Sequence, residues 1–504
     1  MSTRNQELSA SATSASDTRT DTNLKLPADL GLYFGGAWHK PVKGGRVDIH
    51  SPATGEKLTR IYQASTEDID AVVAAAQAGF EVWRNVAPFE RAKILREAAA
   101  VLRANARELA LIDATDTGTP YAEMLKDVEF SAFGIDYFAG LVSEAKGASV
   151  PYGPDRLSFS LREPYGVIAR ICPFNHPLLF TVGRLGAPLA AGNVFVVKPP
   201  EQAPLSALRA AELLDGVLPK GVFNVMPGDK QVSAALVEHP GIAMIAFTGS
   251  VAAGQAVMRA AAGGLKRVML ELGGKNALVA LPDADPDTVA QAVVRGMNFT
   301  WCSQSCGSTS RAFLHEDIYD AVIEKLPEYA GRFRPGLPMD PATTMGCLIN
   351  QEQFDRVKGY IQSAHDEGAR LICGGGRPKN EALQNGYFLE PTVFADVTMG
   401  MRIAREEIFG PVLSVLKWSD EDEMIRQVNQ TEYGLTFSVW GRDITRTMRI
   451  VRRVEAGFCW INEVGPHAFG SPFGGYKKSG IGREESLEEL IYYTQEKNIL
   501  VNLK

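Results

Sequence analysis

The feature that most constrains this fold is a series of short, mostly apolar runs separated by stretches with helical spacing. Four such runs, each followed within two residues by Pro or Gly, are Val167–Cys172, Val194–Val197, Phe223–Met226 and Ile242–Phe247. Strands that are buried on both faces of a parallel sheet have this composition, and crossover helices connect them. Residues 167–274 are therefore predicted to form an open α/β sheet, which binds its ligands at the carboxyl ends of the strands.

Helices and further strands are expected on both sides of this segment. Ser65–Trp83 and Glu90–Ile112 have apolar residues at helical spacing, and Ser65 with Asp68 forms a capping-box pattern. Further along, a second alternation predicts two helices and two strands at Ile318–Leu326, Glu352–Glu367, Val412–Trp418 and Phe458–Asn462. In the last segment, Tyr492–Leu503, apolar and polar residues alternate loosely. This pattern predicts a strand that pairs at a sheet edge or with a partner chain.

Composition and charge exclude several classes of protein. The chain has 504 residues, and its 52 Lys and Arg against 59 Asp and Glu give a net charge of −7. At roughly 150 residues per domain, this length allows two to four domains. The mildly acidic balance argues against nucleic acid or an anionic membrane as a partner. No apolar run approaches the roughly 20 residues that span a bilayer.

The cysteines, histidines and N-terminal residues complete this outline. Six cysteines without a CxxC pair and seven histidines without an HExxH motif indicate neither a disulfide framework nor a metal site. We expect a soluble, cytoplasmic protein with free thiols. Residues 1–29 include a long stretch of Ser, Ala, Thr and Asp and are expected to form a disordered tail.

Candidate ligand-binding groups follow the predicted strands. Phe247-Thr-Gly-Ser250 has the order of a strand, a tight turn and a helix start, where free N–H groups can bind a pyrophosphate. Lys198 ends another strand and Glu201 lies three residues on, so this pair could hold the two hydroxyls of a ribose, and the carboxylate would repel a 2′-phosphate. Taken singly, these residues are at least as typical of an ordinary βα turn and of a surface ion pair.

Two further motifs could carry chemistry. In Glu271-Leu-Gly-Gly-Lys275 a carboxylate is followed by paired glycines, which can bring it close to a ligand. Cys306 is set among small residues in Ser303-Gln-Ser-Cys306-Gly-Ser-Thr-Ser-Arg311, where a thiol is accessible and surrounded by backbone N–H groups. A solvated loop glutamate and an inert core cysteine are the alternatives when each motif is taken alone.

Together the motifs resemble those of the NAD(P)-dependent aldehyde dehydrogenase superfamily, from about Gly31 to the C-terminus. Eight stretches carry the resemblance, in the family's order: Ser51-Pro-Ala-Thr-Gly-Glu56, Pro173-Phe-Asn-His-Pro177, Lys198-Pro-Pro-Glu201, Phe247-Thr-Gly-Ser250, Glu271-Leu-Gly-Gly-Lys275, Gln304-Ser-Cys306 with Arg311, Glu406-Glu-Ile-Phe-Gly-Pro411 and Pro472-Phe-Gly-Gly-Tyr-Lys-Lys-Ser-Gly-Ile-Gly-Arg-Glu484. The resemblance implies an α/β fold with a Rossmann-type cofactor domain, an α/β catalytic domain and a small β oligomerisation element.

The resemblance also implies three catalytic residues. Cys306 would attack the aldehyde to form a thiohemiacetal, and Asn175, with the backbone N–H of Cys306, would hold the oxyanion. Hydride transfer to the nicotinamide would leave a thioester, and Glu271 would activate the water that hydrolyses it. Cys302 is a minor alternative nucleophile, disfavoured because Cys306 has the family's distance to Arg311.

NAD is the cofactor that the resemblance implies. The residues expected around it are Ile171, Pro173, Phe174, Lys198, Glu201, Gly228, Gly249, Ser250, Leu272, Glu407 and Phe409. Lys198 and Glu201 would hold the adenosine ribose, and Gly249 with Ser250 the pyrophosphate. Glu407 and Phe409 would contact the nicotinamide ribose and ring. We expect Glu201 to favour NAD over NADP.

The substrate tunnel is expected to have an aromatic wall. By position it should include His176, Phe180, Gly183, Trp301, His467, Phe469 and Phe473. Gly183 replaces a residue that is often a bulky aromatic in the family, which would widen the tunnel. Aromatic faces with two histidines favour a bulky, aromatic or hydroxylated aldehyde, and the set has no Arg or Lys to bind a distal carboxylate. The same residues could equally serve for packing alone.

The family resemblance gives the expected domains and their assembly. The cofactor-binding domain would comprise residues 30–145 and 163–273, the catalytic domain 274–480, and the oligomerisation element 146–162 and 485–504, in a homodimer or homotetramer. The predicted function is NAD-dependent oxidation of an aldehyde to its carboxylic acid. A CoA-acylating enzyme is the first alternative, disfavoured because transfer to a thiol would not need Glu271. A non-catalytic binding protein is the second, disfavoured because Cys306, Glu271 and Asn175 are all present.

Overall fold

The predicted parallel sheet is present in the computed structural model, which describes residues 24–504, and it is extended at both edges. Its eight strands lie in the order β19 (Gly480–Ile481), β11 (Arg267–Glu271), β10 (Met244–Thr248), β7 (Val167–Ile171), β8 (Val194–Lys198), β9 (Phe223–Val225), β1 (Leu32–Phe34) and β2 (Ala37–His39). The strands from β11 to β9 are parallel, whereas β19, β1 and β2 pair antiparallel. The four apolar runs are thus confirmed as buried strands.

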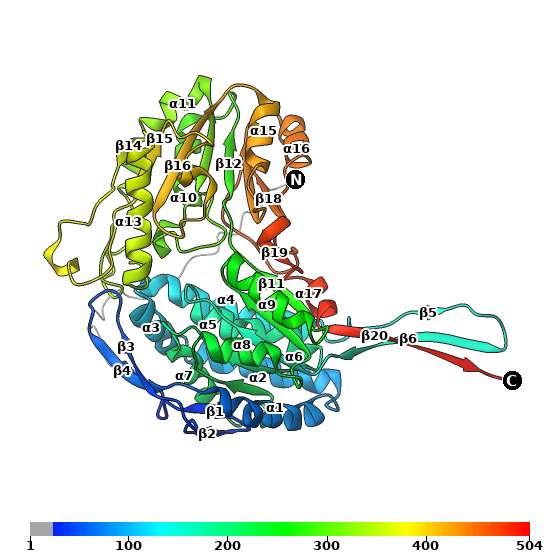
Figure 1. Cartoon of the computed structure of the whole chain (residues 1–504). Helices are drawn as coiled ribbons and strands as arrows, with labels where there is room; N and C mark the ends of the chain where they lie inside the picture. Colours follow the sequence, from blue (N-terminus) through cyan, green and yellow to red (C-terminus); the bar gives the residue numbers. More distant parts are fainter. Residues whose placement is uncertain (1–23) are drawn as a thin grey trace, which may run out of the picture.

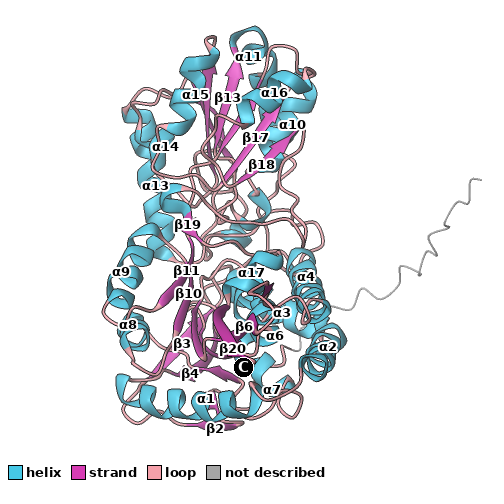
Figure 2. Cartoon of the chain, turned by 90° about the vertical axis from the view of Figure 1, so that its right-hand side faces the viewer, coloured by secondary structure: helices cyan, strands magenta, loops and turns pink. Residues whose placement is uncertain are grey.

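Helices lie on both sides of this sheet, with α8 and α9 on one side and α2 to α4 on the other (Figure 2). Their bounds are α1 (Ile69–Trp83), α2 (Pro88–Ala104), α3 (Ala106–Thr117), α4 (Tyr121–Gly140), α5 (Pro177–Thr181), α6 (Gly186–Ala190), α7 (Leu205–Leu213), α8 (Lys230–Glu238) and α9 (Val251–Ala262). The predicted capping box of Ser65 and Asp68 is present ahead of α1. The single helix predicted over Glu90–Ile112 is wrong, because the Asn105 side chain donates to the Val101 carbonyl at 2.8 Å and α2 ends there.

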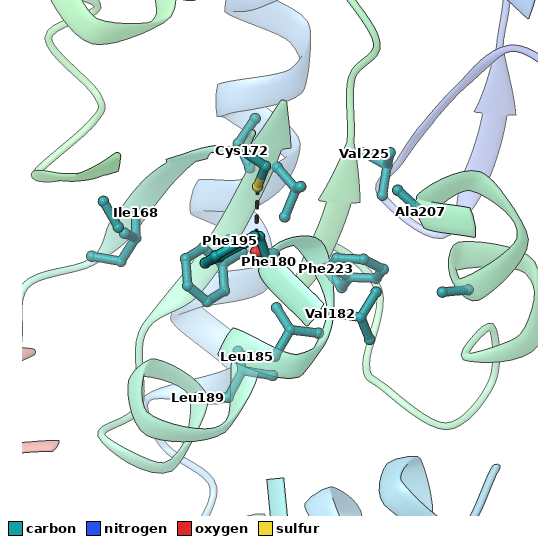
Figure 3. Close-up of a cluster of buried hydrophobic side chains, with 14 of the residues drawn as sticks. Ile168, Cys172, Phe180, Val182, Leu185, Leu189, Phe195, Ala207, Phe223 and Val225 are labelled. Carbon is teal, nitrogen blue, oxygen red and sulfur yellow. Dashed lines mark hydrogen bonds between the residues drawn. The ribbon is translucent and has the colours of Figure 1, made fainter. Parts of the chain in front are cut away.

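The first core joins the sheet to the short helices that follow β7. Figure 3 shows Ile168 of β7 and Phe195 of β8 near Phe180, Val182 and Leu185, all of which belong to this core. The Cys172 thiol donates to the Phe180 carbonyl oxygen at 3.3 Å. This packing holds residues 172–185 in place, and part of that segment lines the candidate site.

A second α/β layer begins at Ala277 and has its own core. Its seven strands lie in the order β14 (Arg370–Cys373), β15 (Thr392–Ala395), β16 (Val412–Trp418), β13 (Arg311–His315), β12 (Ala277–Ala280), β17 (Thr436–Trp440) and β18 (Phe458–Ile461). Only the β14–β15 pair is antiparallel. Its helices are α10 (Pro286–Gly296), α11 (Glu316–Ile323), α12 (Leu326–Ala330), α13 (Gln351–Asp366), α14 (Arg402–Arg405), α15 (Glu421–Asn429) and α16 (Ile444–Val451). The helix predicted over Ile318–Leu326 is therefore two helices, α11 and α12.

A third sheet projects from the body as an arm (Figure 1). It consists of β20 (Thr494–Asn502), β6 (Arg156–Pro164) and β5 (Ser149–Val150), and β20 pairs antiparallel with β6 along its whole length. The predicted C-terminal strand is thus confirmed. However, α17 (Leu487–Tyr492) contributes Leu490 to the first core, and Tyr493 joins it there, so the oligomerisation segment expected at 485–504 begins too early.

The remaining elements are small. A two-stranded sheet pairs β3 (Arg46–His50) with β4 (Lys57–Tyr62). The 3₁₀ helices are η1 (Thr66–Asp68), η2 (Gly183–Leu185), η3 (Phe299–Trp301), η4 (Glu381–Leu383) and η5 (Lys477–Ser479). Leu24 and Leu26 pack against the first core, so the disordered tail expected over 1–29 is too long, and its residues 1–23 lie outside the described part of the chain. Within that part, no helix combines the length and apolar character needed to cross a bilayer.

Candidate active site

Two cavities share part of their walls at the ends of the first sheet's strands. Their volumes are about 160 Å³ and about 450 Å³. The residues that line both are Asn175, Phe180, Thr248, Glu271 and Cys306. The three residues predicted to be catalytic therefore lie together, in the wall where the smaller and the larger cavity adjoin.

Each of the three comes from a segment whose position the fold determines. Glu271 is the last residue of β11, and Asn175 lies between β7 and α5. Cys306 lies in the loop that leads into β13, and Asn276 holds this loop by donating to the carbonyl oxygens of Cys306 at 2.7 Å and Ser308 at 3.0 Å. The Asn276 contacts were not predicted, although the residue directly follows the Glu271 motif.

The Asn175 amide is fixed beside the same loop. Its Nδ2 donates to the carbonyl oxygen of Gln304 at 2.8 Å. The Gln304 side chain is itself anchored, donating to the Cys347 carbonyl at 3.1 Å and accepting from the Ile349 N–H at 3.0 Å. Because an amide nitrogen carries two hydrogens, Asn175 has a second donor for a ligand next to Cys306.

Burial raises the pKa values of both reactive groups. Burial, followed by the charges of Glu271 and Glu407, raises the pKa of the Cys306 thiol to about 12. Glu271 is buried, and neither of its carboxylate oxygens has a hydrogen-bond partner among the described residues. Burial and then the charge of Glu484 hold the pKa of Glu271 well above its usual range. A carboxyl group kept in such surroundings is typical of a catalytic acid or base.

The alternative nucleophile, Cys302, has no access to either cavity. It is fully buried in the second core and lines neither cavity, and burial raises the pKa of its thiol well above the usual value. The geometry therefore favours Cys306 over Cys302.

The smaller cavity gathers most of the residues expected at the cofactor. Those that line it are Pro173, Phe174, Gly249, Ser250, Leu272, Glu407 and Phe409. Ser250 is the N-cap of α9, where free backbone N–H groups face outward from the helix start. The rings of Phe174 and Phe409 meet edge to face, with their centroids 5.8 Å apart. Ile171, Lys198, Glu201 and Gly228 do not line this cavity.

Lys198 and Glu201 lie together at the end of β8. The Lys198 ammonium is 3.6 Å from the Glu201 carboxylate, and Glu201 is exposed whereas Lys198 is buried. Burial lowers the pKa of Lys198, although the Glu201 charge acts in the opposite direction. Since β8 is the parallel neighbour of β7, this pair lies at the same edge of the sheet as the smaller cavity.

Helix α13 supports the segment Glu407–Phe409, a contact that the sequence did not reveal. Gln353 donates to the carbonyl oxygens of Ile408 at 3.1 Å and Phe409 at 2.7 Å, and Arg356 donates to that of Glu407 at 2.7 Å. Phe409 has a φ of +57°, a conformation that is costly for a bulky residue and persists only when its surroundings impose it. Gln353 and Arg356 themselves line the smaller cavity.

A glycine allows the Glu407 side chain to reach the loop after β11. Glu407 accepts a hydrogen bond from the backbone N–H of Gly274 at 3.0 Å. A Cβ atom at Gly273 would lie 2.0 Å from the Glu407 carboxylate, so a larger residue there would displace this side chain. The paired glycines of the Glu271 motif thus bring two carboxylates into the wall of one cavity.

Five of the seven residues expected in the substrate tunnel line the larger cavity. They are His176, Phe180, Trp301, His467 and Phe473. Gly183 does not line it, since a Cβ there would lie 2.6 Å from the Ser131 hydroxyl, and the glycine instead allows η2 to approach α4. The expectation that Gly183 widens the tunnel is therefore wrong. Phe469 packs on α4 beside Phe130, outside the cavity wall.

The larger cavity also contains charged residues that were not predicted. Lys126, Asp127, Arg184, Glu484 and Glu485 line it, so the expected absence of Arg and Lys from the wall is wrong. Both cations are nevertheless paired. The Arg184 guanidinium lies 2.8 Å from Glu485 and 3.3 Å from Glu484, and Lys126 lies 2.7 Å from Glu123.

Comparison with known proteins gives one consistent result. Residues 38–499 match the model of the aldehyde dehydrogenase family. The chain is 49% identical over 486 residues to aldehyde dehydrogenase tropH of Talaromyces stipitatus, covering 95% of this chain and 94% of that protein.

Solved structures agree with that match. The NAD+ complex of an aldehyde dehydrogenase from Bacillus cereus is 37% identical, with a TM-score of 0.91 over 94% of this chain and 97% of that one. The P. syringae AldA indole-3-acetaldehyde dehydrogenase in complex with NAD+ and IAA is 34% identical, with a TM-score of 0.92 over 96% and 98% of the two chains. The fold, the cavities at its strand ends and these relatives lead to one conclusion: this chain belongs to the aldehyde dehydrogenase family.

Proposed function

We propose that this aldehyde dehydrogenase oxidises a bulky, aromatic or hydroxylated aldehyde to its carboxylic acid with NAD, using Cys306 as nucleophile and Glu271 as base. The observation that carries the proposal is the position of Cys306 in the wall that the two cavities share. A nucleophile that must hold the aldehyde carbon close to a hydride acceptor needs access to both ligands at once.

Covalent addition begins with the Cys306 thiol. With a pKa of about 12 the thiol keeps its proton at neutral pH, so a base must accept that proton as the sulfur attacks. Glu271 lies in the same wall, and its raised pKa makes its carboxylate a better proton acceptor than an ordinary glutamate. As the C–S bond forms, the aldehyde oxygen becomes an alkoxide. The second Asn175 N–H and the Cys306 backbone N–H would donate to this oxygen.

Hydrolysis completes the reaction. When bound, NAD would accept the hydride from the tetrahedral carbon, which leaves a thioester on Cys306. Glu271, after releasing its first proton to solvent, would take a proton from water as the water oxygen adds to the thioester carbon. The C–S bond then breaks and the acid leaves. The Cys306 sulfur takes the proton that Glu271 carries, which restores the thiol and the carboxylate.

The smaller cavity fits a dinucleotide. Gly249 and Ser250 line it at the start of α9, a helix of 12 residues whose N-terminus would favour a pyrophosphate. The two related structures described above were solved with NAD+. Lys198 and Glu201 would hold the adenosine ribose, and the exposed Glu201 carboxylate would repel the 2′-phosphate of NADP.

The size and composition of the larger cavity support a bulky substrate. Its volume is about 450 Å³, and its aromatic lining residues are Phe130, Phe180, Trp301, Trp460 and Phe473. Flat aromatic walls contact a planar ring over its whole face, and so they favour an aromatic aldehyde over a small aliphatic one.

The test is NADH formation, followed by absorbance, with aliphatic, aromatic and carboxylated aldehydes, each with NAD and with NADP. The proposal expects the highest kcat/KM for bulky or aromatic aldehydes with NAD. A higher kcat/KM with NADP would overturn the role of Glu201, and activity confined to small aldehydes would overturn the substrate class. Turnover that requires CoA would show that the acyl group is transferred to CoA and not hydrolysed.

A further inference from the structure

Two imidazole–carboxylate pairs lie in the wall of the larger cavity, outside the group of proposed catalytic residues. His176, directly before α5, has its Nδ1 2.6 Å from a carboxylate oxygen of Asp127 on α4. His467, in the loop between β18 and η5, has its Nδ1 2.6 Å from a carboxylate oxygen of Glu485. All four residues line the cavity.

Each carboxylate determines which nitrogen of its histidine carries the proton. An ionised carboxylate only accepts hydrogen bonds, so Nδ1 must be the donor in both pairs. Although burial opposes its ionisation, Arg184 and His467 lower the pKa of Glu485 below the usual value. In a neutral imidazole the other nitrogen, Nε2, is then an acceptor. Within residues 24–504 Nε2 of either histidine has no hydrogen-bond partner.

Resting on the proposed function, we propose that His176 and His467 determine substrate specificity by accepting hydrogen bonds from hydroxyl groups of an aromatic aldehyde. Asp127 and Glu485 are positioning residues, which hold the tautomer that presents an acceptor to the cavity. An acceptor pairs with a hydroxyl donor, and a site built to bind a hydroxyl group discriminates against the analogue that lacks it.

The surroundings of the two imidazoles favour a planar ring. The His176 ring lies 5.3 Å from the Trp301 ring and 6.0 Å from the Phe180 ring. His467 stacks on Phe473 with 4.9 Å between the centroids. A ring seated among these aromatic faces would bring its substituents toward the two Nε2 atoms.

The charges of the wall select a neutral hydroxyl group over a carboxylate. The acidic lining residues are Glu123, Asp127, Glu271, Glu484 and Glu485, against the cations Lys126 and Arg184. Even with Glu271 protonated, carboxylates outnumber cations, and both cations are already paired. A carboxylate on the substrate would meet like charges in a desolvated wall, which would make binding of a carboxylated aldehyde less favourable.

The first test compares wild-type kcat/KM for benzaldehyde, 3- and 4-hydroxybenzaldehyde and 4-carboxybenzaldehyde with NAD. A hydroxylated aldehyde is expected to exceed benzaldehyde by about tenfold, which corresponds to about 1.4 kcal/mol, and the carboxylated one is expected to fall below it. Equal values for benzaldehyde and both hydroxybenzaldehydes would overturn the inference and leave the proposed function standing. An absence of NADH with every aldehyde would instead reject the proposed function.

Variants of the two histidines distinguish the effect of the hydrogen-bond acceptor from the effect of side-chain shape. In His176→Phe and His467→Phe, the ratio of kcat/KM for the hydroxylated aldehyde to kcat/KM for benzaldehyde should fall about tenfold. A Gln at either position keeps a hydrogen-bond acceptor and should restore much of this ratio. Asp127→Asn should raise KM for the hydroxylated aldehyde more than for benzaldehyde, with less effect on kcat. His239→Phe is the matched control, because His239 pairs with Asp70 at 2.9 Å but does not line the cavity. An unchanged ratio in both Phe variants would contradict the proposal.

Discussion

Cys306 and Cys302 lie close together in the sequence, but burial gives them different chemistry. Cys302 is sealed in the second core, whereas Cys306 is half-buried and borders both cavities. The thiol pKa is raised in both, so thiol acidity does not distinguish them, and access to the ligands does. At the scale of single residues, the site therefore depends on which side chains reach the shared wall.

Replacing the nucleophile tests this difference. Cys306→Ser should lower kcat by at least about a thousandfold, because a serine hydroxyl in the same surroundings is a much weaker nucleophile. NAD binding, measured by calorimetry, should persist because the cofactor residues are unchanged. Cys302→Ser is the control and should retain turnover. The nucleophile assignment would fail if Cys306→Ser kept wild-type activity.

Glu271 gives the reaction a pH dependence of defined sign. The base must be ionised, and its pKa is raised, so the deacylation rate should increase as pH rises through a range above that of an ordinary carboxyl group. Because Glu271 is also proposed to accept the thiol proton, Glu271→Gln should slow both the burst of NADH and the steady-state rate, the latter about a hundredfold or more, and remove this pH limb. Stopped-flow absorbance across the pH range measures both effects. A mutant with a wild-type burst would restrict Glu271 to deacylation and contradict its role as acceptor of the thiol proton.

At the scale of elements, α13 and the Glu407–Phe409 segment form one unit across the smaller cavity. The helix supplies hydrogen bonds to three consecutive carbonyl oxygens of that segment, and Phe409 keeps its positive φ there. The helix thus acts on the cofactor side by holding the backbone of its neighbour.

Loss of this support should weaken cofactor binding. Gln353→Leu removes two hydrogen bonds and leaves two carbonyl oxygens without a donor, which should raise KM for NAD about tenfold. The control is Gln362→Leu on the same helix, where Gln362 bonds only to the exposed Asp366. Steady-state kinetics with varied NAD measures the change. Equal KM values for the two variants would show that the segment does not need this support.

The sequence predicted best those features that each segment encodes by itself. Val167–Ile171 and its parallel neighbours were recognised because strands buried on both faces consist mostly of apolar residues. The breaks at Asn105 and in the segment Ile318–Leu326 were missed because short helices in succession keep the same apolar spacing. The residues proposed as catalytic were identified from their motifs.

Contacts between distant segments were the features that the sequence did not reveal. Gly183 was misplaced because its role is set by Ser131, on another helix. Asp127 and Glu485 could not be connected with His176 and His467, since only the folded chain brings α4 and the C-terminal segment to the same cavity. Such pairings have no local pattern in the sequence.

At the scale of the whole molecule, the arm of β5, β6 and β20 projects from the body (Figure 1). It carries Leu157, Leu161 and Leu500, whose exposed fractions are 44%, 44% and 51%. Apolar side chains on a projecting sheet are typical of a surface that a second subunit covers. This agrees with the expected homodimer or homotetramer.

Charges on the arm should therefore disrupt assembly. Leu161→Asp combined with Leu500→Asp should shift the protein from an oligomer toward the monomer in light scattering coupled to gel filtration, because each carboxylate would have to be desolvated in the interface. Ile444→Asp changes a similarly exposed residue, at 59%, on α16 and should leave the oligomer intact. A monomeric wild-type protein would contradict the expected assembly.

The partial overlap of the two cavities also affects how this enzyme can evolve. Among residues 24–504, five belong to both walls, and three of them are the proposed catalytic residues. Substitutions elsewhere in the larger cavity can alter which aldehyde is accepted without contacting the cofactor side. One reaction can therefore be adapted to new metabolites through substitutions in the larger cavity alone, while the proposed catalytic residues are inherited unchanged.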